Sequence, residues 1–318
     1  VVGKLHLPKR WNSSSVSSKP CRYRETPVEH VSLCVWSCIP TAVHVTDIHN
    51  ALERVEQLKS WLASGNHKLD VVLISGDIAN APMDWNLTAE QEEQYQKDLQ
   101  VVVDSFTSVK SRVYFIPGNH DVLPVFKVGE DSPPLVPSNP PFPCNMHMKR
   151  TTIAPNLHLL GLGGSVPGYQ GGEMIWEGFP YRNYSEMDSD VHKLLDPVFF
   201  EDTSCLAAND AVILMTHVGP AESDTSYIRE DPQKPIVSGN KELMKLIATE
   251  KMQRHCVLNI HGHSHFSPGQ CVVGKTRILN PGPLQDGCYG LYTLRQRAGH
   301  SPSWEVASVC FHTLPSTS

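Results

Sequence analysis

The sequence predicts a layered α/β fold, and three observations support this prediction. Several short apolar runs, such as residues 71–74 and 211–215, have the length of a buried strand rather than of a helix. Amphipathic stretches lie between the first of these runs, in the strand–helix alternation that is typical of α/β proteins. Polar residues follow directly after most of the runs, at the strand ends where open α/β sheets bind ligands.

The first half of the chain alternates strand and helix candidates. Strands are expected within residues 31–45, where the candidate ends in Ala42-Val43-His44-Val45, and at residues 71–74 and 112–116. A helix is expected at residues 51–63, because its apolar positions share one face. These positions are Leu52, Val55, Leu58, Trp61 and Leu62. Gly65-Asn66 is expected to end this helix, and residues 90–106 predict the next one.

The second half is interrupted by longer loops. Residues 122–150 hold too many prolines for a helix or a central strand, so we expect a surface insertion that acts as a lid or a substrate wall. Residues 166–189 and 219–239 are also expected to be loops, and residues 240–249 a helix. Further strands are expected at residues 157–162, 211–215, 256–260 and 277–279, with a closing strand at 289–294.

Length and composition are those of one ordinary globular domain. The chain has 318 residues, of which 40% are hydrophobic and 19% charged, and no apolar run approaches the roughly 20 residues that span a bilayer. Residues 1–30 are expected to be a tail or arm, and residues 31–318 one domain. The net charge of −6 disfavours a nucleic-acid-binding face, so a nucleic-acid partner is not expected.

The cysteines and the N-terminus predict a cytoplasmic protein. Nine cysteines without a CxxC pair favour reduced thiols over a disulfide framework, and the N-terminus lacks a signal-peptide core and an initiator Met, as a processed or trimmed chain would. Three glycosylation-type triplets, at Asn12, Asn86 and Asn183, point the other way.

Residues with metal-binding side chains follow five of the expected strands. They are Asp47 and His49, Asp77, Asn119 and His120, His217, and His263 and His265. Carboxylate, imidazole and amide oxygen together suit first-row divalent metals, and no thiolate is among them. The seven candidate ligands, which are these residues without His120, are too many for one tetrahedral ion. They fit two ions that share a bridging carboxylate.

Each piece alone has a simpler interpretation. Asp47 is a plausible helix N-cap, and Gly76-Asp77 and Asn119-His120-Asp121 are typical turn sequences. His217 alone is typical of a hydrogen-bonded loop histidine. These interpretations would require five independent coincidences at five strand ends in order, so we favour the metal site.

The order of these blocks resembles that of the calcineurin-like metallophosphoesterase superfamily. The matching blocks are Asp47-x-His49, Gly76-Asp77, Gly118-Asn119-His120-Asp121, His217 and Gly262-His263-x-His265, and they extend over about residues 40 to 295. The resemblance implies a four-layer α/β/β/α sandwich with a dinuclear metal centre. It assigns Asp47, His49, Asp77 and His265 to one ion. It assigns Asp77, Asn119, His217 and His263 to the second, with Asp77 bridging.

The same resemblance implies a hydrolase. Two divalent ions would supply a metal-bridged hydroxide that attacks the phosphorus of a phosphodiester or small organic phosphate. The ligand types leave the identity of the ions open among Mn, Fe, Zn and Ni. His120 lies beside ligand Asn119 without a metal of its own, so it is the expected general acid for the leaving group. Asp121 is expected either to orient His120 or a ligand, or to cap a helix.

Departures from related families narrow the expected activity. No Arg follows Asp77, as it would in phosphoprotein phosphatases, and Asn80 stands where purple acid phosphatases have Tyr. The chain therefore resembles the phosphodiesterase-like branch, as do the loop at residues 161–165 and the turn Asn280-Pro281-Gly282. The alternative is a catalytically silent scaffold of the same fold. A DNA-repair nuclease is disfavoured by the acidic charge balance.

Two further groups of residues have alternative roles. Trp176, Phe179, Tyr181 and Tyr184 would either stack on a nucleobase or aryl ester or pack against the domain. His44 and His261 are expected in the core or behind the ligands. Substrate specificity is expected to reside in the two insertions at 122–150 and 166–189.

Overall fold

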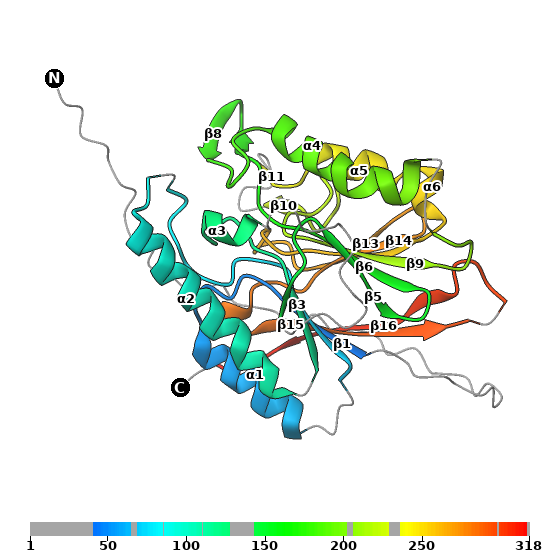
Figure 1. Cartoon of the computed structure of the whole chain (residues 1–318), viewed down its shortest axis with the longest axis horizontal. Coiled ribbons are helices and arrows are strands. Elements are labelled where there is room, and N and C mark those ends of the chain that lie inside the picture. Colours follow the sequence, from blue (N-terminus) through cyan, green and yellow to red (C-terminus); the bar gives the residue numbers. More distant parts are fainter. Residues whose placement is uncertain are drawn as a thin grey trace. The chain divides into compact units, whose positions relative to one another are not determined.

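The computed structural model describes residues 41–64, 69–84, 86–109, 111–127, 143–201, 206–228, 236–297 and 299–316. All of them belong to one compact unit, Trp36–Ser318, which contains two six-stranded sheets and a smaller four-stranded sheet (Figure 1). The expected tail at residues 1–30 and the turn at Gly65-Asn66 lie outside the described residues.

The first large sheet contains the strands of the N-terminal half. Its order is β16-β15-β1-β2-β3-β4. The bounds are β1 Thr41–Val45, β2 Val71–Ile74, β3 Arg112–Phe115, β4 Cys144–Asn145, β15 Cys288–Gln296 and β16 Trp304–Thr313. Strands β1 to β4 are parallel, and β15 and β16 are added antiparallel. Helices α1 (Leu52–Ser64) and α2 (Ala89–Ser105) connect the parallel strands, and a 3₁₀ turn, Phe106–Val109, follows α2.

The second large sheet has the order β13-β14-β12-β9-β6-β5. Its strands are β5 Lys149–Ala154, β6 Leu157–Leu162, β9 Ala211–Thr216, β12 Cys256–Ile260, β13 Gly269–Val273 and β14 Thr276–Asn280. The four inner strands are parallel, and the two edge strands are antiparallel. Its outer helical segments are α4 (Tyr184–Leu195), the π-helical turn Asp196–Phe200, α5 (Lys241–Ile247) and α6 (Glu250–Gln253) (Figure 1).

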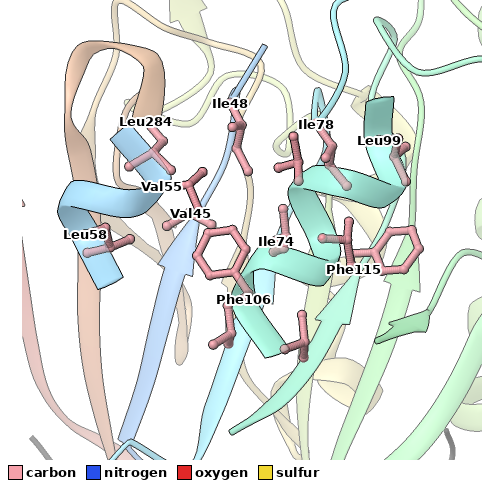
Figure 2. Packing of buried hydrophobic residues seen from close by; sticks show 14 of the residues in the cluster. Val45, Ile48, Val55, Leu58, Ile74, Ile78, Leu99, Phe106, Phe115 and Leu284 are labelled. Carbon is pink, nitrogen blue, oxygen red and sulfur yellow. The ribbon is translucent and has the colours of Figure 1, made fainter. Parts of the chain in front are cut away.

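Three hydrophobic clusters establish four layers. Because strand side chains alternate between faces, Val72 and Ile74 of β2 pack with Val55 of α1 and with Leu99 and Phe106 (Figure 2). Val71 and Leu73, the alternate residues of the same strand, pack instead with Leu159 and Ile213 of the second sheet. The other face of that sheet, with Leu160 and Val212, packs against Val191 and Leu243 of its helices. The expected four-layer α/β/β/α arrangement is confirmed.

The expected loop at residues 166–189 contains regular structure. Strands β7 (Gly168–Gln170) and β8 (Glu173–Trp176) form a hairpin that pairs with β11 (Ile236–Val237), which pairs in turn with β10 (Tyr227–Ile228). Gly171 and Gly172 form its two-residue turn, with φ of 59° and 90°. A Gly-Gly pair is a known hairpin signal, and the shortness of the flanking strands hid it. Helix α4 then begins inside the same stretch, capped by Asn183.

The stretch at residues 122–150 also holds more regular structure than its prolines predict. It contains the single turn α3 (Leu123–Phe126), the edge strand β4 and the start of β5. Proline is tolerated in the first turn of a helix, where Pro124 lies. Residues 128–142, which hold most of the prolines, lie outside the described residues, so the lid remains a prediction.

The C-terminal prediction was wrong in one respect. The strand expected at 289–294 is β15, but it does not close the fold, because β16 follows and pairs with it along its length. Edge strands β5 and β13 were also missed, since such strands bury a single face and leave a weak apolar signal. None of the described helices combines the length and apolarity needed to cross a membrane.

Candidate metal centre

The predicted ligands are delivered by strand ends of both large sheets. Asp47, Asp77 and Asn119 follow β1, β2 and β3 of the first sheet, while His217 and His263 follow β9 and β12 of the second. Main-chain hydrogen bonds fasten these loops to one another. Within the first sheet, Asp47 N–H donates to Gly76 O at 3.0 Å, and within the second, Gly262 N–H donates to His217 O at 3.0 Å.

The first cluster consists of Asp47, His49, Asp77 and His265, whose candidate ligand atoms all lie within 4.8 Å of one another. His265 Nε2 lies 3.0 Å from Asp47 Oδ1, and His49 Nε2 lies 3.7 Å from Asp77 Oδ2. Asp47 and Asp77 are almost completely buried. These are the side chains that the resemblance assigned to one ion.

The second cluster consists of Asp77, His217 and His263, again with ligand atoms within 4.8 Å. His217 Nε2 lies 3.4 Å from Asp77 Oδ1 and 2.9 Å from Asn119 Oδ1, which places the amide oxygen beside this cluster. Asp77 belongs to both clusters, so its two oxygens face different sets of histidines. The arrangement is that of a carboxylate shared between two adjoining sites.

The hydrogen-bond inventory fits metal ions at these positions. His49 Nε2 and His263 Nε2 are buried ring nitrogens without a hydrogen-bond partner, one in each cluster. Buried polar atoms are normally paired, so two such atoms beside the same carboxylate fit positions that bind a metal ion. Imidazole nitrogens together with carboxylate and amide oxygens form a donor set suited to Mn, Fe or Zn.

Four of the clustered residues have backbone conformations that L-residues rarely adopt. The φ angles are 51° at Asp47, 48° at His49, 50° at Asp77 and 63° at His263. Each such conformation costs on the order of 1 kcal/mol or more and persists only where the surroundings impose it. Close packing of the loops is one such constraint. A Cβ on Gly118 would overlap the backbone nitrogen and the carboxylate of Asp77.

Burial and ion pairing shift the pKa values in opposite directions. Burial opposes ionisation of Asp47, but the charge and hydrogen bond of His265 outweigh it and lower the pKa of Asp47 to about 2. Burial likewise opposes protonation of His217, yet the nearby Asp77 raises the pKa of His217 to about 9. His263 has no such partner at short range, so burial and then the charge of His217 lower its pKa to about 3.

His120 lies beside the clusters but belongs to neither. Its backbone N–H donates to Asp77 Oδ1 at 2.7 Å, and its ring lies 5.0 Å from that of His49. Its Nδ1 is 2.9 Å from Ala81 O, a carbonyl that can only accept, so Nδ1 carries a hydrogen and donates. The opposite nitrogen, Nε2, is therefore the one left to exchange a proton.

Asp121 does not orient His120. Its buried carboxylate accepts hydrogen bonds from the backbone of Gly118 at 2.7 Å, Ala79 at 2.8 Å and Ile78 at 3.1 Å. It thus joins the loop after β3 to the loop after β2. Burial, followed by the charge of Asp77, raises the pKa of Asp121 to about 7.

Asn280 fixes the loop that carries the proposed ligands His263 and His265. Its side-chain amide donates to the carbonyls of Ser264 at 2.9 Å, Ser267 at 3.2 Å and Thr225 at 3.3 Å, and so fixes the loop that carries His263 and His265. Sequence reasoning singled out the turn that contains Asn280 but not this role.

His44 and His261 occupy the positions expected for them. His44 is buried between Ser75 Oγ at 2.7 Å and the Tyr292 hydroxyl at 2.9 Å. His261 Nε2 is 2.8 Å from Thr225 Oγ1.

A cleft of about 200 Å³ opens over the two clusters. It is lined by Asp77, Met83, Asn119, His120, Trp176, His263, His265 and Phe266. Of the four aromatic residues expected either to bind or to pack, Trp176 lines this cleft. Phe179 and Tyr181 are buried, and the Tyr184 hydroxyl donates to Pro167 O at 3.1 Å.

Comparison with solved structures found several similar chains. A solved structure matches with a TM-score of 0.60 at 14% identity, covering 87% of this chain and 100% of its own. The protein TT1561 of Thermus thermophilus matches with a TM-score of 0.49 at 15% identity, over 87% of this chain and 100% of its own. A dimetal phosphatase from Danio rerio has a TM-score of 0.45 at 10% identity, over 87% and 99%.

The comparison with curated proteins gave no match. The family model of the calcineurin-like phosphoesterases, in contrast, matches residues 40–267, which include every residue of both clusters. With the four-layer fold and this match over most of the chain, the protein belongs to the calcineurin-like phosphoesterase family.

Proposed function

We propose that the protein is a dinuclear-metal-dependent hydrolase of phosphodiesters or small organic phosphates. The observation that supports this most directly is the sharing of Asp77 between two ligand clusters, each with a buried, unpartnered imidazole nitrogen. Asp47, His49, Asp77 and His265 would hold one divalent ion. Asp77, Asn119, His217 and His263 would hold the other.

The residues around the clusters have distinct tasks in this proposal. When bound, the two ions would lower the pKa of a water molecule and offset the charge of the phosphoryl oxygens. The Nε2 atoms of His265 and His217 lie beside the carboxylates of Asp47 and Asp77, so each imidazole–carboxylate pair would bind the same ion. His120, protonated at Nε2, would donate that proton to the departing alkoxide or aryloxide oxygen.

The lining of the cleft supports a small ester over a phosphoprotein. None of the eight residues that line it is Lys or Arg, so beyond the two proposed ions the described cleft offers no such side chain to a second phosphate or an acidic peptide. This agrees with the absence of Arg after Asp77 in the sequence. A phosphodiesterase is therefore proposed ahead of a phosphoprotein phosphatase.

A cytoplasmic location remains a prediction. It is supported by the free thiols of Cys144, Cys256, Cys271, Cys288 and Cys310. Thiols of this kind persist in a reducing compartment.

The proposal is tested by counting metals and measuring turnover together. The protein is stripped with a chelator, reloaded with Mn²⁺, and assayed on bis(p-nitrophenyl) phosphate and p-nitrophenyl phosphate. We expect two ions per chain and turnover of the diester. Asn119→Ala should lose one ion and most of the turnover. Asn209→Ala, an exposed asparagine at the opposite end of β9, should keep both.

The competing function is a catalytically silent scaffold of the same fold. A folded protein that binds ions but hydrolyses neither ester would establish the scaffold. A protein that binds no ions would refute the metal centre itself.

A further inference from the structure

The cleft over the two clusters has a polar floor and an apolar wall. The floor consists of the proposed ligands and His120, and the wall of Met83, Trp176 and Phe266. The three wall residues come from separate parts of the chain. An ester whose phosphoryl group reaches the floor can place its organic group against this wall.

Trp176 is held rigidly in that wall. It ends β8 and pairs across the hairpin with Gly168, where a Cβ would overlap the indole ring, so the ring lies directly over the glycine. The ring also meets the edge of His263, with centroids 5.9 Å apart and planes at 70°. A half-buried ring held by these two neighbours loses little entropy when a ligand stacks on it.

Phe266 is exposed yet well positioned. It follows His265 directly, and 62% of its surface is open to solvent. The loop that carries Phe266 is fixed by the side-chain amide of Asn280, which donates hydrogen bonds to the carbonyls of Ser264 and Ser267. Exposed phenylalanines are common, but this one borders the cleft beside a proposed metal ligand.

Charge narrows what these rings can bind. Because the eight lining residues include no Lys or Arg, further phosphates or carboxylates on the organic group would find no such side chain to pair with beside Met83, Trp176 and Phe266. An uncharged planar ring would instead gain from burial and from stacking on the two aromatic side chains.

We infer that the cleft selects phosphoesters whose organic group carries an uncharged aromatic ring, bound by Trp176 and Phe266. The inference rests on the proposed function, since it requires the phosphoryl group at the two clusters. The shared chemistry is that of a nucleobase or an aryl ester.

The binding of phosphonates measures the contribution of the aromatic ring to affinity separately from that of the phosphoryl group. Phenylphosphonate, cyclohexylphosphonate and methylphosphonate, which contain no phosphoester bond to hydrolyse, are titrated calorimetrically into the Mn²⁺-loaded protein. His120→Ala is used for the two phosphoesters AMP and ribose 5-phosphate, to slow their hydrolysis. We expect phenylphosphonate to bind about 5- to 100-fold more tightly than methylphosphonate, the range for one stacked ring. Cyclohexylphosphonate should fall between them.

Variants of the wall residues test whether Trp176 and Phe266 cause the preference for phenylphosphonate. Phe266→Leu and Trp176→Leu should each reduce the phenyl-to-methyl ratio while leaving methylphosphonate affinity unchanged. Val272→Ala serves as the control, because Val272 is equally exposed at 62% but lies on edge strand β13. Phe266→Leu keeps the test decisive if Trp176→Leu disturbs the hairpin.

Two further ligands identify the source of the ring. If AMP binds more tightly than ribose 5-phosphate and Phe266→Leu abolishes the difference, the ring is a nucleobase. If AMP shows no advantage and phenylphosphonate does, it is an aryl group. Equal affinity for all three phosphonates, or a ratio insensitive to both variants, would overturn the inference. Failure of every phosphonate to bind would instead refute the proposed metal centre.

Discussion

His120 differs from the neighbouring histidines in what faces the second nitrogen of its ring. The Nδ1 atoms of His120 and His217 both lie beside a backbone carbonyl, Ala81 O and Ser75 O, but only His217 turns its Nε2 to the Asp77 carboxylate within a ligand cluster. A carbonyl fixes the tautomer and orients the ring without supplying a charge, which suits a residue that must exchange a proton at the other nitrogen. The proposed role of His120 as general acid can therefore be tested by replacing this one residue.

Replacing His120 should slow hydrolysis in proportion to how much the leaving group needs a proton. We expect His120→Gln to lower kcat by about 10²–10⁴-fold for a phenyl ester, since that is the usual contribution of a general acid. The loss should be smaller for the p-nitrophenyl ester, whose leaving oxygen is less basic. Steady-state kinetics on both esters measure it, and equal losses on the two would contradict the role.

His44 should make stability depend on pH. Burial, and then the charge of His261, lower the pKa of His44 to about 3 from its ordinary 6.5. Between pH 6.5 and about 3, the unfolded chain therefore binds a proton at His44 that the folded chain does not bind. The contribution of neutral His44 to the free energy of unfolding is fully present above pH 6.5 and decreases as the pH falls toward 3.

Replacing His44 should weaken that dependence by one proton. Between pH 6 and pH 4, His44→Gln should lose about 1.4 kcal/mol less per pH unit than the parent, measured by urea unfolding in the presence of a chelator. His300→Gln, at an exposed position, is the control and should keep the parent slope. Parallel pH profiles for parent and His44→Gln would refute the prediction.

The site is made of short loops that follow the strands, and these loops pack closely against one another. Each large sheet presents the carboxyl ends of its parallel strands, and the loops there are fastened by main-chain hydrogen bonds and by Asp121 and Asn280. Gly118 is the tightest example, because the loop after β3 contacts Asp77 there. Such loops position ligands more precisely than long ones would.

Adding one methyl group at Gly118 should therefore separate the ligands. We expect Gly118→Ala to displace Asp77 and to lower metal affinity by 10-fold or more, on the order of what changes around a ligand usually cost. Calorimetric Mn²⁺ titration measures this, with circular dichroism confirming the fold. Gly171→Ala is the matched control: Gly171 also lies in a turn, with a positive φ of 59°, but nothing lies within 4 Å of its missing Cβ. Equal losses in both variants would show that the collision at Gly118 is not responsible.

At the scale of the whole molecule, the proposed ligands join the two large sheets. Asp47, Asp77 and Asn119 come from the first sheet, and the three histidines His217, His263 and His265 from the second. The hydrophobic cluster between the sheets already holds them together, with Leu73 on one side and Ile213 on the other. Bound ions would add a link at one edge of this interface.

Removing the ions should destabilise the protein at that edge. Mn²⁺ at 100-fold above its dissociation constant should add about 2.7 kcal/mol per site to the free energy of unfolding. Thermal unfolding with and without chelator measures the change, and hydrogen exchange should rise in ligand loops of both sheets. Asp77→Asn, which lacks the shared carboxylate, should show little response to Mn²⁺. A melting temperature unaffected by chelator in the parent would contradict the link.

The sequence predicted the inner strands and the first two helices within a few residues. The run Val71–Ile74 and the amphipathic face of α1 are local patterns that report burial directly. The hairpin β7–β8 and the edge strands β5 and β13 escaped prediction, because none of these strands contains a continuous run of buried residues of the kind that identified the inner strands.

What the sequence determined by itself was the set of chemical groups and their order: a carboxylate, amide or imidazole after each of five strands, in the arrangement of one family. The geometry in which these groups meet comes from the tertiary structure. Asp77 lies beside His49, from the neighbouring loop of its own sheet, and beside His217, which the packing of the second sheet against the first brings to it. Likewise, the hairpin brings Trp176 to His263, although 87 positions separate them in the sequence. Such contacts depend on how sheets and hairpins pack, which no local pattern of residues encodes.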